Sequence, residues 1–130
     1  MRRILQAALD AAEPYEAVRR ALSLKGRSLQ TAGCAYDLRR IRRVAVVGAG
    51  KAAIPMARAV SDILRGRVES AFVVTAVAGK VGPKSGIEAA VAGHPIPDRR
   101  GLRAAQRILE TALSLGSEDL LIVLLSGGAS

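Results

Sequence analysis

Two short runs of apolar residues constrain the fold of this chain more than any other feature of its sequence. Val44–Val47 and Leu120–Leu125 contain no polar side chain. A strand that is apolar at every position has to be covered on both faces, which is typical of parallel sheets flanked by helices. Each run ends in a glycine-rich turn, 48–50 after the first and 126–130 after the second. The sequence therefore predicts a buried sheet with two glycine turns beyond its strands.

Further strand and helix patterns alternate between these two runs. Apolar residues at three- and four-residue spacing predict a helix over 52–65, and β-branched residues predict a strand over 71–75. A weaker strand is predicted over 87–92, and a further helix follows Asp98, which is a favourable N-cap residue. We therefore expect a Rossmann-like α/β fold over residues 44–130, with an open, mainly parallel sheet flanked by helices.

The first 43 residues differ in character from the rest of the chain. Their apolar spacing predicts helices over 2–12 and from Pro14 to about Leu24, followed by a loop over 25–33. We interpret residues 1–43 as a helical N-terminal preface to the α/β domain.

Basic residues are concentrated in this preface. Residues 1–43 hold ten Lys and Arg against four Asp and Glu, whereas residues 44–130 hold ten against seven. Because arginine pairs well with phosphate, one interpretation is a polyanion-binding surface. Nucleic-acid binding would also need aromatic side chains for base stacking, and the chain has one Phe, two Tyr and no Trp. We favour solvated helix faces and expect no nucleic-acid partner.

Signals for secretion, membrane insertion and structural metal binding are absent from the sequence. Cys34 is the single cysteine, so no intrachain disulfide can form, which fits a reducing cytoplasm. The N-terminus lacks the apolar stretch of a signal peptide, and no run of about eighteen apolar residues could span a membrane. No Cys, His and carboxylate cluster has metal-ligand spacing. We expect a cytoplasmic protein with no membrane partner and no metal-ligating residues of its own.

The turn after the first apolar run is a candidate anion-binding site. Ligands of open α/β sheets bind beyond the carboxyl ends of the strands, where glycines allow close approach and helix N-termini attract anions. Lys51 directly follows Gly50. A lysine here can neutralise phosphate charge, whereas the helix dipole disfavours a purely structural cation. Because 126–130 also follows a buried strand, we expect the two turns to lie side by side on one edge of the sheet.

Two known phosphate-binding motifs fit this turn only in part. Gly48, Gly50 and Ala53 match the dinucleotide pattern G-x-G-x-x-G/A. The acidic residue that should hold the ribose is missing, because Glu69 precedes the second strand instead of following it. A Walker A loop needs Ser or Thr after the lysine, where this chain has Ala52.

Other candidate functional residues have structural interpretations as well. His94 is the only histidine, and in its proline-rich loop it either packs between prolines or contacts a ligand. Asp98 is better explained as a helix cap than as a ligand contact. Ser126 and Ser130 lack a G-x-S-x-G context and no second histidine is available as a base, so a hydrolase triad is disfavoured.

Four stretches together resemble the glycerate 2-kinase family with a MOFRL-type C-terminal domain, some members of which are labelled hydroxypyruvate reductase. These stretches are 11–22, 47–57, 92–98 and 125–130. The gly-his-pro-x-pro-asp block and the ser-gly-gly block are the most distinctive. Ala129 departs from the pattern, since the family usually has a third glycine there. The resemblance covers only the N-terminal part of a family member.

The resemblance implies an ATP-dependent kinase that phosphorylates the 2-hydroxyl of D-glycerate with Mg²⁺, in a cleft between two domains. Lys51 matches the family's functional lysine and is the expected catalytic residue. The expected substrate- or nucleotide-binding residues are Gly48, Gly50, Ser126, Gly127, Gly128, Ser130 and His94.

Several expectations follow from the part of the family that is missing here. Because a second domain would supply the remaining groups, we expect these 130 residues alone to have no measurable kinase activity. One alternative is an NAD(P)-dependent oxidoreductase of the hydroxypyruvate reductase type, and another is a non-enzymatic polyanion-binding module. The sequence leaves open whether the chain forms a homodimer.

Overall fold

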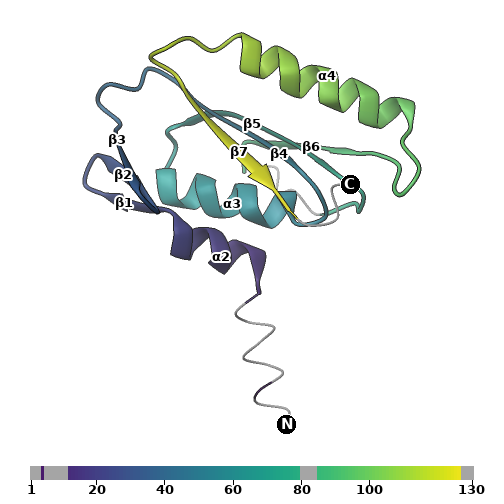
Figure 1. Cartoon of the computed structure of the whole chain (residues 1–130), viewed down its shortest axis with the longest axis horizontal. Coiled ribbons are helices and arrows are strands. Elements are labelled where there is room, and N and C mark those ends of the chain that lie inside the picture. Colours follow the sequence, from purple (N-terminus) through teal and green to yellow (C-terminus); the bar gives the residue numbers. More distant parts are fainter. Residues whose placement is uncertain (1–3, 5–11, 80–84, 127–130) are drawn as a thin grey trace.

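The computed structural model describes residue 4 and residues 12–79 and 85–126. Most of the helix predicted over 2–12 lies outside these residues. The elements, in chain order (Figure 1), are α2 (Pro14–Ala21), β1 (Ser23–Lys25), β2 (Ser28–Thr31), β3 (Cys34–Asp37), β4 (Val44–Ala49), α3 (Ala53–Leu64), β5 (Val68–Thr75), β6 (Ile87–Val91), α4 (Arg99–Leu113) and β7 (Leu120–Leu125). No helix in the described part of the chain is long and apolar enough to cross a membrane.

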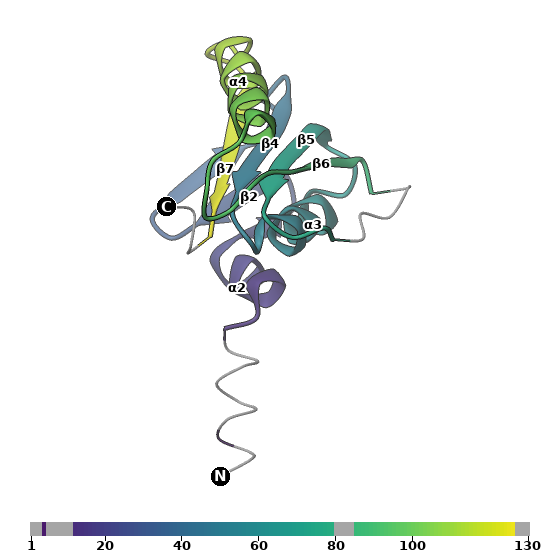
Figure 2. The same cartoon turned by 90° about the vertical axis from the view of Figure 1, so that its right-hand side faces the viewer.

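A parallel four-stranded sheet forms the centre of the molecule. Its strand order is β6-β5-β4-β7, and β4 pairs in parallel with both β5 and β7. The chain steps from β4 to β5 in one direction and from β6 to β7 in the other. Since such crossovers are right-handed, their helices α3 and α4 cover opposite faces of the sheet (Figure 2). The predicted α/β class and mainly parallel sheet are confirmed.

The core lies between α3 and one face of this sheet. Val46 and Val73 of the strands and Val60 and Leu64 of the helix are almost completely buried. Alanines on the same side of α3 let the helix approach the sheet closely. β4 is buried at its first five positions, as its apolar sequence predicts.

The prediction of a helical preface is wrong for residues 22–37. The helix ends at Ala21, and an antiparallel three-stranded sheet of order β1-β2-β3 follows where a longer helix and a loop were expected. Two-residue turns, 26–27 and 32–33, interrupt the helical pattern. Each contains a glycine with a positive φ, Gly26 (61°) and Gly33 (95°), and such left-handed glycines favour hairpins. Leu29 joins the hydrophobic cluster of the main sheet. The domain boundary at residue 43 stays a prediction.

Candidate active site

The 48–50 turn and Ser126, the first residue of the second turn, lie side by side at the carboxyl edge of the sheet. β4 and β7 are adjacent and in register, with Ala49 opposite Leu125. The next residue of β7's chain, Ser126, donates its backbone N–H to the carbonyl oxygen of Ala49 at 3.2 Å. The structure therefore places Ser126 against the 48–50 turn, as the sequence predicts. The remaining residues of the second turn, Gly127, Gly128 and Ser130, lie outside the described residues.

Gly50 occupies a position that other residues do not fit. Its φ of 114° lies in the region that L side chains rarely adopt, and its N–H donates to the carbonyl oxygen of Val74 at 3.0 Å. A Cβ at this position would overlap the hydroxyl of Ser126. Gly48 is also tightly enclosed, since a Cβ there would lie 3.0 Å from the carbonyl oxygen of Leu124. Both glycines are thus required for the close approach of β4 and β7.

The Ser126 side chain connects the second turn to the start of α3. The residue before this helix, Ala52, has no side chain that can cap it, and its own N–H donates to Ser126 Oγ at 3.2 Å. One of the free donors of the helix start is therefore satisfied from the neighbouring strand. Pro55 in the first turn has no N–H to satisfy. The hydroxyl fixes the turn at the point where a ligand would bind.

Lys51 supplies a cation at this edge of the sheet. Its side chain is exposed, immediately before α3, between Gly50 and Ala52. It makes no hydrogen bond or ion pair with any residue in the described ranges. Here the positive end of the helix dipole and the ammonium group add to each other. An uncompensated cation in this position is suited to contact with an anion, such as a carboxylate or a phosphoryl group.

His94 lies on the same edge of the sheet but farther along it. It is exposed in the loop after β6, and β5 separates β6 from β4. In the described part of the chain, no contact brings His94 to Lys51 or Ser126. Its participation in a ligand site stays a prediction.

Asp98, in the same loop as His94, is a helix cap, as predicted. Its carboxylate accepts the N–H of Gly101 at 2.9 Å and the Nε–H of Arg100 at 2.7 Å. These bonds and one from the N–H of Gly93 lower the pKa of Asp98 to about 2, the Gly101 bond contributing most. The carboxylate of Asp98 therefore caps and stabilises the start of α4.

Thr75, which was not singled out as a site residue from the sequence, lies at this edge as well. It ends β5, between the carboxyl ends of β4 and β6, and its side chain is 3% exposed. Its hydroxyl oxygen accepts the N–H of Val77 at 3.3 Å. A polar residue that closes an apolar strand is the signal that could have identified it. The hydroxyl shapes the turn that follows β5, next to the glycine turn.

The described residues do not form a cage for a divalent cation. No three His, Cys, Asp or Glu side chains gather within residues 12–79 and 85–126. Asp98, the carboxylate nearest in the sequence to His94, is already bound by Arg100 and by backbone N–H groups. Mg²⁺ prefers carboxylate oxygens and phosphate groups as ligands. The donor set present here therefore does not fit Mg²⁺.

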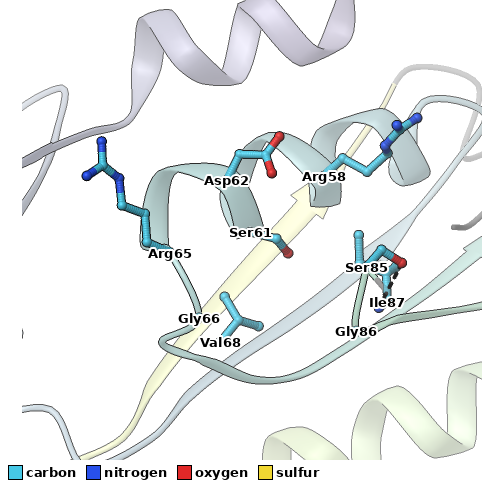
Figure 3. A pocket seen from close by; sticks show the side chains of 9 residues that line it. All are labelled: Arg58, Ser61, Asp62, Arg65, Gly66, Val68, Ser85, Gly86 and Ile87. Carbon is cyan, nitrogen blue, oxygen red and sulfur yellow. Dashed lines mark hydrogen bonds between the residues drawn. The ribbon is translucent and has the colours of Figure 1, made fainter. Parts of the chain in front are cut away.

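A hollow of about 650 Å³ lies at the opposite edge of the sheet (Figure 3). It is lined by residues of α3 and by the starts of β5 and β6, including Arg58, Arg65, Val68 and Ile87. Asp62 lies between the two arginines and accepts the hydroxyl of Tyr15 at 2.8 Å. Because cations and an anion share this open surface, it is less suited to binding an anion than the edge at Lys51.

Comparison with known proteins connects this fold to a family. A family model described as "Domain of unknown function (DUF4147)" matches residues 1–130. A D-glycerate 2-kinase from Thermotoga maritima is 39% identical over 88 residues, which are 68% of this chain and 21% of the relative. A putative hydroxypyruvate reductase from Agrobacterium vitis is 36% identical over 130 residues, which are 100% of this chain and 26% of the relative.

A solved structure shares the arrangement of elements. The crystal structure of glycerate kinase from Thermotoga maritima matches with a TM-score of 0.75 and 29% identity, over 97% of this chain and 27% of that one. The chain thus spans about a quarter of the length of these relatives. The family model, the relative from Agrobacterium vitis and the solved structure each match at least 97% of the chain. The chain therefore belongs to the glycerate 2-kinase family and corresponds to its DUF4147 domain.

Proposed function

We propose that the edge formed by Gly50, Lys51 and Ser126 is one side of the active site of a glycerate 2-kinase. The reaction transfers the γ-phosphoryl group of ATP to the 2-hydroxyl of D-glycerate in the cytoplasm. One observation carries the proposal: the Lys51 ammonium has no partner among the described residues, and it follows a glycine turn that Ser126 fixes. The relatives named glycerate kinase support the choice of reaction.

Lys51 acts in this proposal as a point charge. Phosphoryl transfer depends on positioning and on neutralising charge more than on covalent chemistry. The ammonium group binds either the carboxylate of glycerate or the oxygens of the transferred phosphoryl group, and both are anions. Gly48 and Gly50 keep side chains away from the ligand, and Ser126 fixes the turn. The further ligand contacts that the sequence predicts are Gly127, Gly128, Ser130 and His94.

The other side of the active site comes from outside the matched region. ATP supplies the phosphoryl group, and Mg²⁺ neutralises its charge when bound. The described residues offer no carboxylate cluster for the metal, so its ligands belong to the part of the relatives that this chain does not match. We therefore expect the 130 residues alone to be inactive, although the edge at Lys51 still binds anions weakly.

A chimera tests the role of Lys51 directly. This chain would replace the matching 27% of the Thermotoga maritima glycerate kinase, and kinase activity would be assayed with ATP and D-glycerate. We expect Lys51→Ala to lower kcat roughly 100- to 1000-fold, as loss of a preorganised charge does. Lys25→Ala, which removes an exposed cation from β1, serves as the matched control and should leave kcat unchanged. A Lys51→Ala chimera with unaltered kcat and KM would overturn the proposal.

An NAD(P)-dependent reductase is the second candidate, because the same turn fits the dinucleotide pattern and one relative is named a putative hydroxypyruvate reductase. The structure weakens this candidate. Glu69 lies near the start of β5, at the far edge of the sheet, and Thr75 and Ala76 occupy the end of that strand where an acid should hold the ribose. Titration of the chimera with NADH decides between the two: fluorescence transfer with NADH, and no turnover with ATP, would favour the reductase.

A polyanion-binding surface has little support from the side-chain contacts. Three arginines of the basic N-terminal third are engaged in ion pairs: Arg39 with Asp37, and Arg42 and Arg43 with Asp119. Cations that are already paired gain less from a phosphate backbone. Binding to random duplex DNA that weakens steeply with salt would favour this function instead.

A further inference from the structure

The outer side of α4 carries three leucines that are mostly exposed. The helix packs against β4, β5 and β6 on the side that bears the buried Ala104, and Figure 1 shows no labelled element beyond its outer side. Leu102 is 61% exposed, Leu109 58% and Leu113 76%. At 3.6 residues per turn, these leucines fall within about 40° of one another around the helix axis and roughly opposite Ala104. We call these three residues the leucine stripe. Exposed apolar patches of this kind mark interaction surfaces.

The leucine stripe has the spacing of a helix–helix seam. Leu102 and Leu109 are seven residues apart, and Leu113 follows four residues later, as in a coiled coil. The fifteen residues of α4 make such a seam about 22 Å long. Ala105 and Ala112 lie on one flank of the stripe, where their small side chains allow a second helix to approach closely. The pattern therefore indicates another helix as the partner of this side of α4.

Charges on the other flank of the stripe select which helix that is. Arg103 and Glu110 are seven residues apart, so they lie on the same flank, one near each end of α4. Neither side chain has an ion pair or a hydrogen bond with the residues that the structure describes.

A second copy of α4, running antiparallel, complements these charges. A two-fold axis perpendicular to the plane of the two helices reverses the helix direction and keeps the charged flank on the same side in both copies. Arg103 of each copy then faces Glu110 of the other copy. In a parallel pair this flank would face Ala105 and Ala112 instead, with no opposite charge to meet. The charge pattern therefore favours the antiparallel pair.

We propose that the 130-residue chain forms a two-fold symmetric homodimer through the leucine stripe, with its two α4 helices antiparallel. Leu113 of one copy packs against Leu102 of the other, and Leu109 lies near the two-fold axis. Because a single helix pair is small beside the roughly 1,200–2,000 Å² of a stable interface, we expect a weak dimer, with a Kd of about 1–100 µM. The inference concerns a surface separate from Lys51 and does not depend on the proposed function.

Sedimentation equilibrium of the 130-residue chain tests the dimer. The mean mass should rise from that of one chain toward that of two over about 1–500 µM. Leu109→Glu should raise the Kd at least about tenfold, because it places a charge in the apolar seam of both copies. Ile96→Glu is the matched control and should leave the Kd unchanged, since Ile96 is 79% exposed in the loop before α4, outside the stripe.

Charge reversal tests the antiparallel arrangement. Arg103→Glu and Glu110→Arg each place like charges opposite one another, so each variant alone should have a Kd roughly 5- to 10-fold above wild type at low salt. A mixture of the two variants restores both attractive pairs and should form a mixed dimer with a Kd close to that of wild type. Arg58→Glu makes the same charge change at an exposed position on α3 and should have no effect.

Several results would overturn the inference. One is a chain that stays monomeric at every concentration. Another is a dimer that Leu109→Glu leaves unchanged, or that the mixture of charge variants does not restore, since it would use another surface or orientation. A monomer that binds anionic phospholipid vesicles through Leu109 would assign the stripe to a lipid surface instead. Lys51→Ala should dimerise as wild type does, so failure of the proposed function would leave this result unaffected.

Discussion

The two ends of β4 hold their cations in opposite ways. At the amino edge, Arg42 and Arg43 precede β4, and both contact the carboxylate of Asp119, which precedes β7, at 3.1 and 2.7 Å. At the carboxyl edge, Lys51 follows β4 and contacts no acidic group within the described ranges. The same two strands thus begin at a cluster of paired charges and end beside a lysine that has no ion-pair partner among the described residues. We infer that the first fixes the fold and that the second is available for a ligand.

The amino-edge cluster is closed by further hydrogen bonds. The Asp119 side chain has no exposed surface, and it also accepts the N–H of Gly116 at 2.8 Å. Arg43 donates in addition to the carbonyl oxygen of Ser114 at 2.9 Å. Bonds from Arg43, then from Arg42 and Gly116, hold the pKa of Asp119 far below its usual range. Each charged group of the cluster therefore has a partner within the protein.

The largest effect on stability is expected from Gly50→Ala. The backbone strain of a side chain at this φ costs roughly 1–3 kcal/mol. The new Cβ also overlaps the Ser126 hydroxyl and displaces it from the N–H of Ala52. Gly66→Ala is the matched control, because Gly66 also has a positive φ (82°) but has no atom within 4 Å of an added Cβ. Urea unfolding should show a larger loss of stability for Gly50→Ala than for Gly66→Ala.

The double variant Gly50→Ala/Ser126→Ala sharpens this result. Removing the hydroxyl removes the overlap, so the double variant should be more stable than the sum of the two single losses predicts. Strictly additive losses would mean that a side chain at position 50 does not contact the Ser126 hydroxyl, and the site geometry would then be incorrect.

The next largest effect is expected from Asp119→Asn. The neutral amide cannot satisfy two guanidinium groups, so Tm should fall by several degrees, whereas Lys51→Ala should leave Tm nearly unchanged. The sign of the pH dependence follows from the lowered pKa. The folded carboxyl has a pKa below the ordinary value of 3.8, so its contribution is complete above about pH 5 and is lost as the pH falls toward the folded pKa. Wild type should lose stability between pH 4 and 2 more steeply than Asp119→Asn, as measured by thermal unfolding at each pH.

The sequence predicts the parallel sheet well because its strands are apolar throughout and end at glycines. Val44–Val47 and Leu120–Leu125 allow few other arrangements, and the contact between Gly50 and Ser126 follows from their pairing. The three strands over 23–37 were missed because they are short and carry polar side chains, so only their glycine turns indicate them. The Asp119 cluster joins residues 76 and 77 positions apart, and no local pattern can reveal it.

The smallest effect, and the one that tests the comparison most closely, concerns Asp98. This acid lies on the carboxyl edge with Lys51, yet its contacts are those of a structural charge: the N–H of Gly101 and the guanidinium of Arg100. Asp98→Ala should lower Tm by roughly 3–5 °C, because a helix N-cap is lost. Asp98→Asn should lower it far less, since asparagine caps equally well and the lost ion pair with Arg100 is largely exposed. In the chimera, Asp98→Asn should also keep its kcat. If instead kcat collapsed while Tm held, Asp98 would act on the ligand, and the carboxyl edge would contribute an acid as well as a cation to the site.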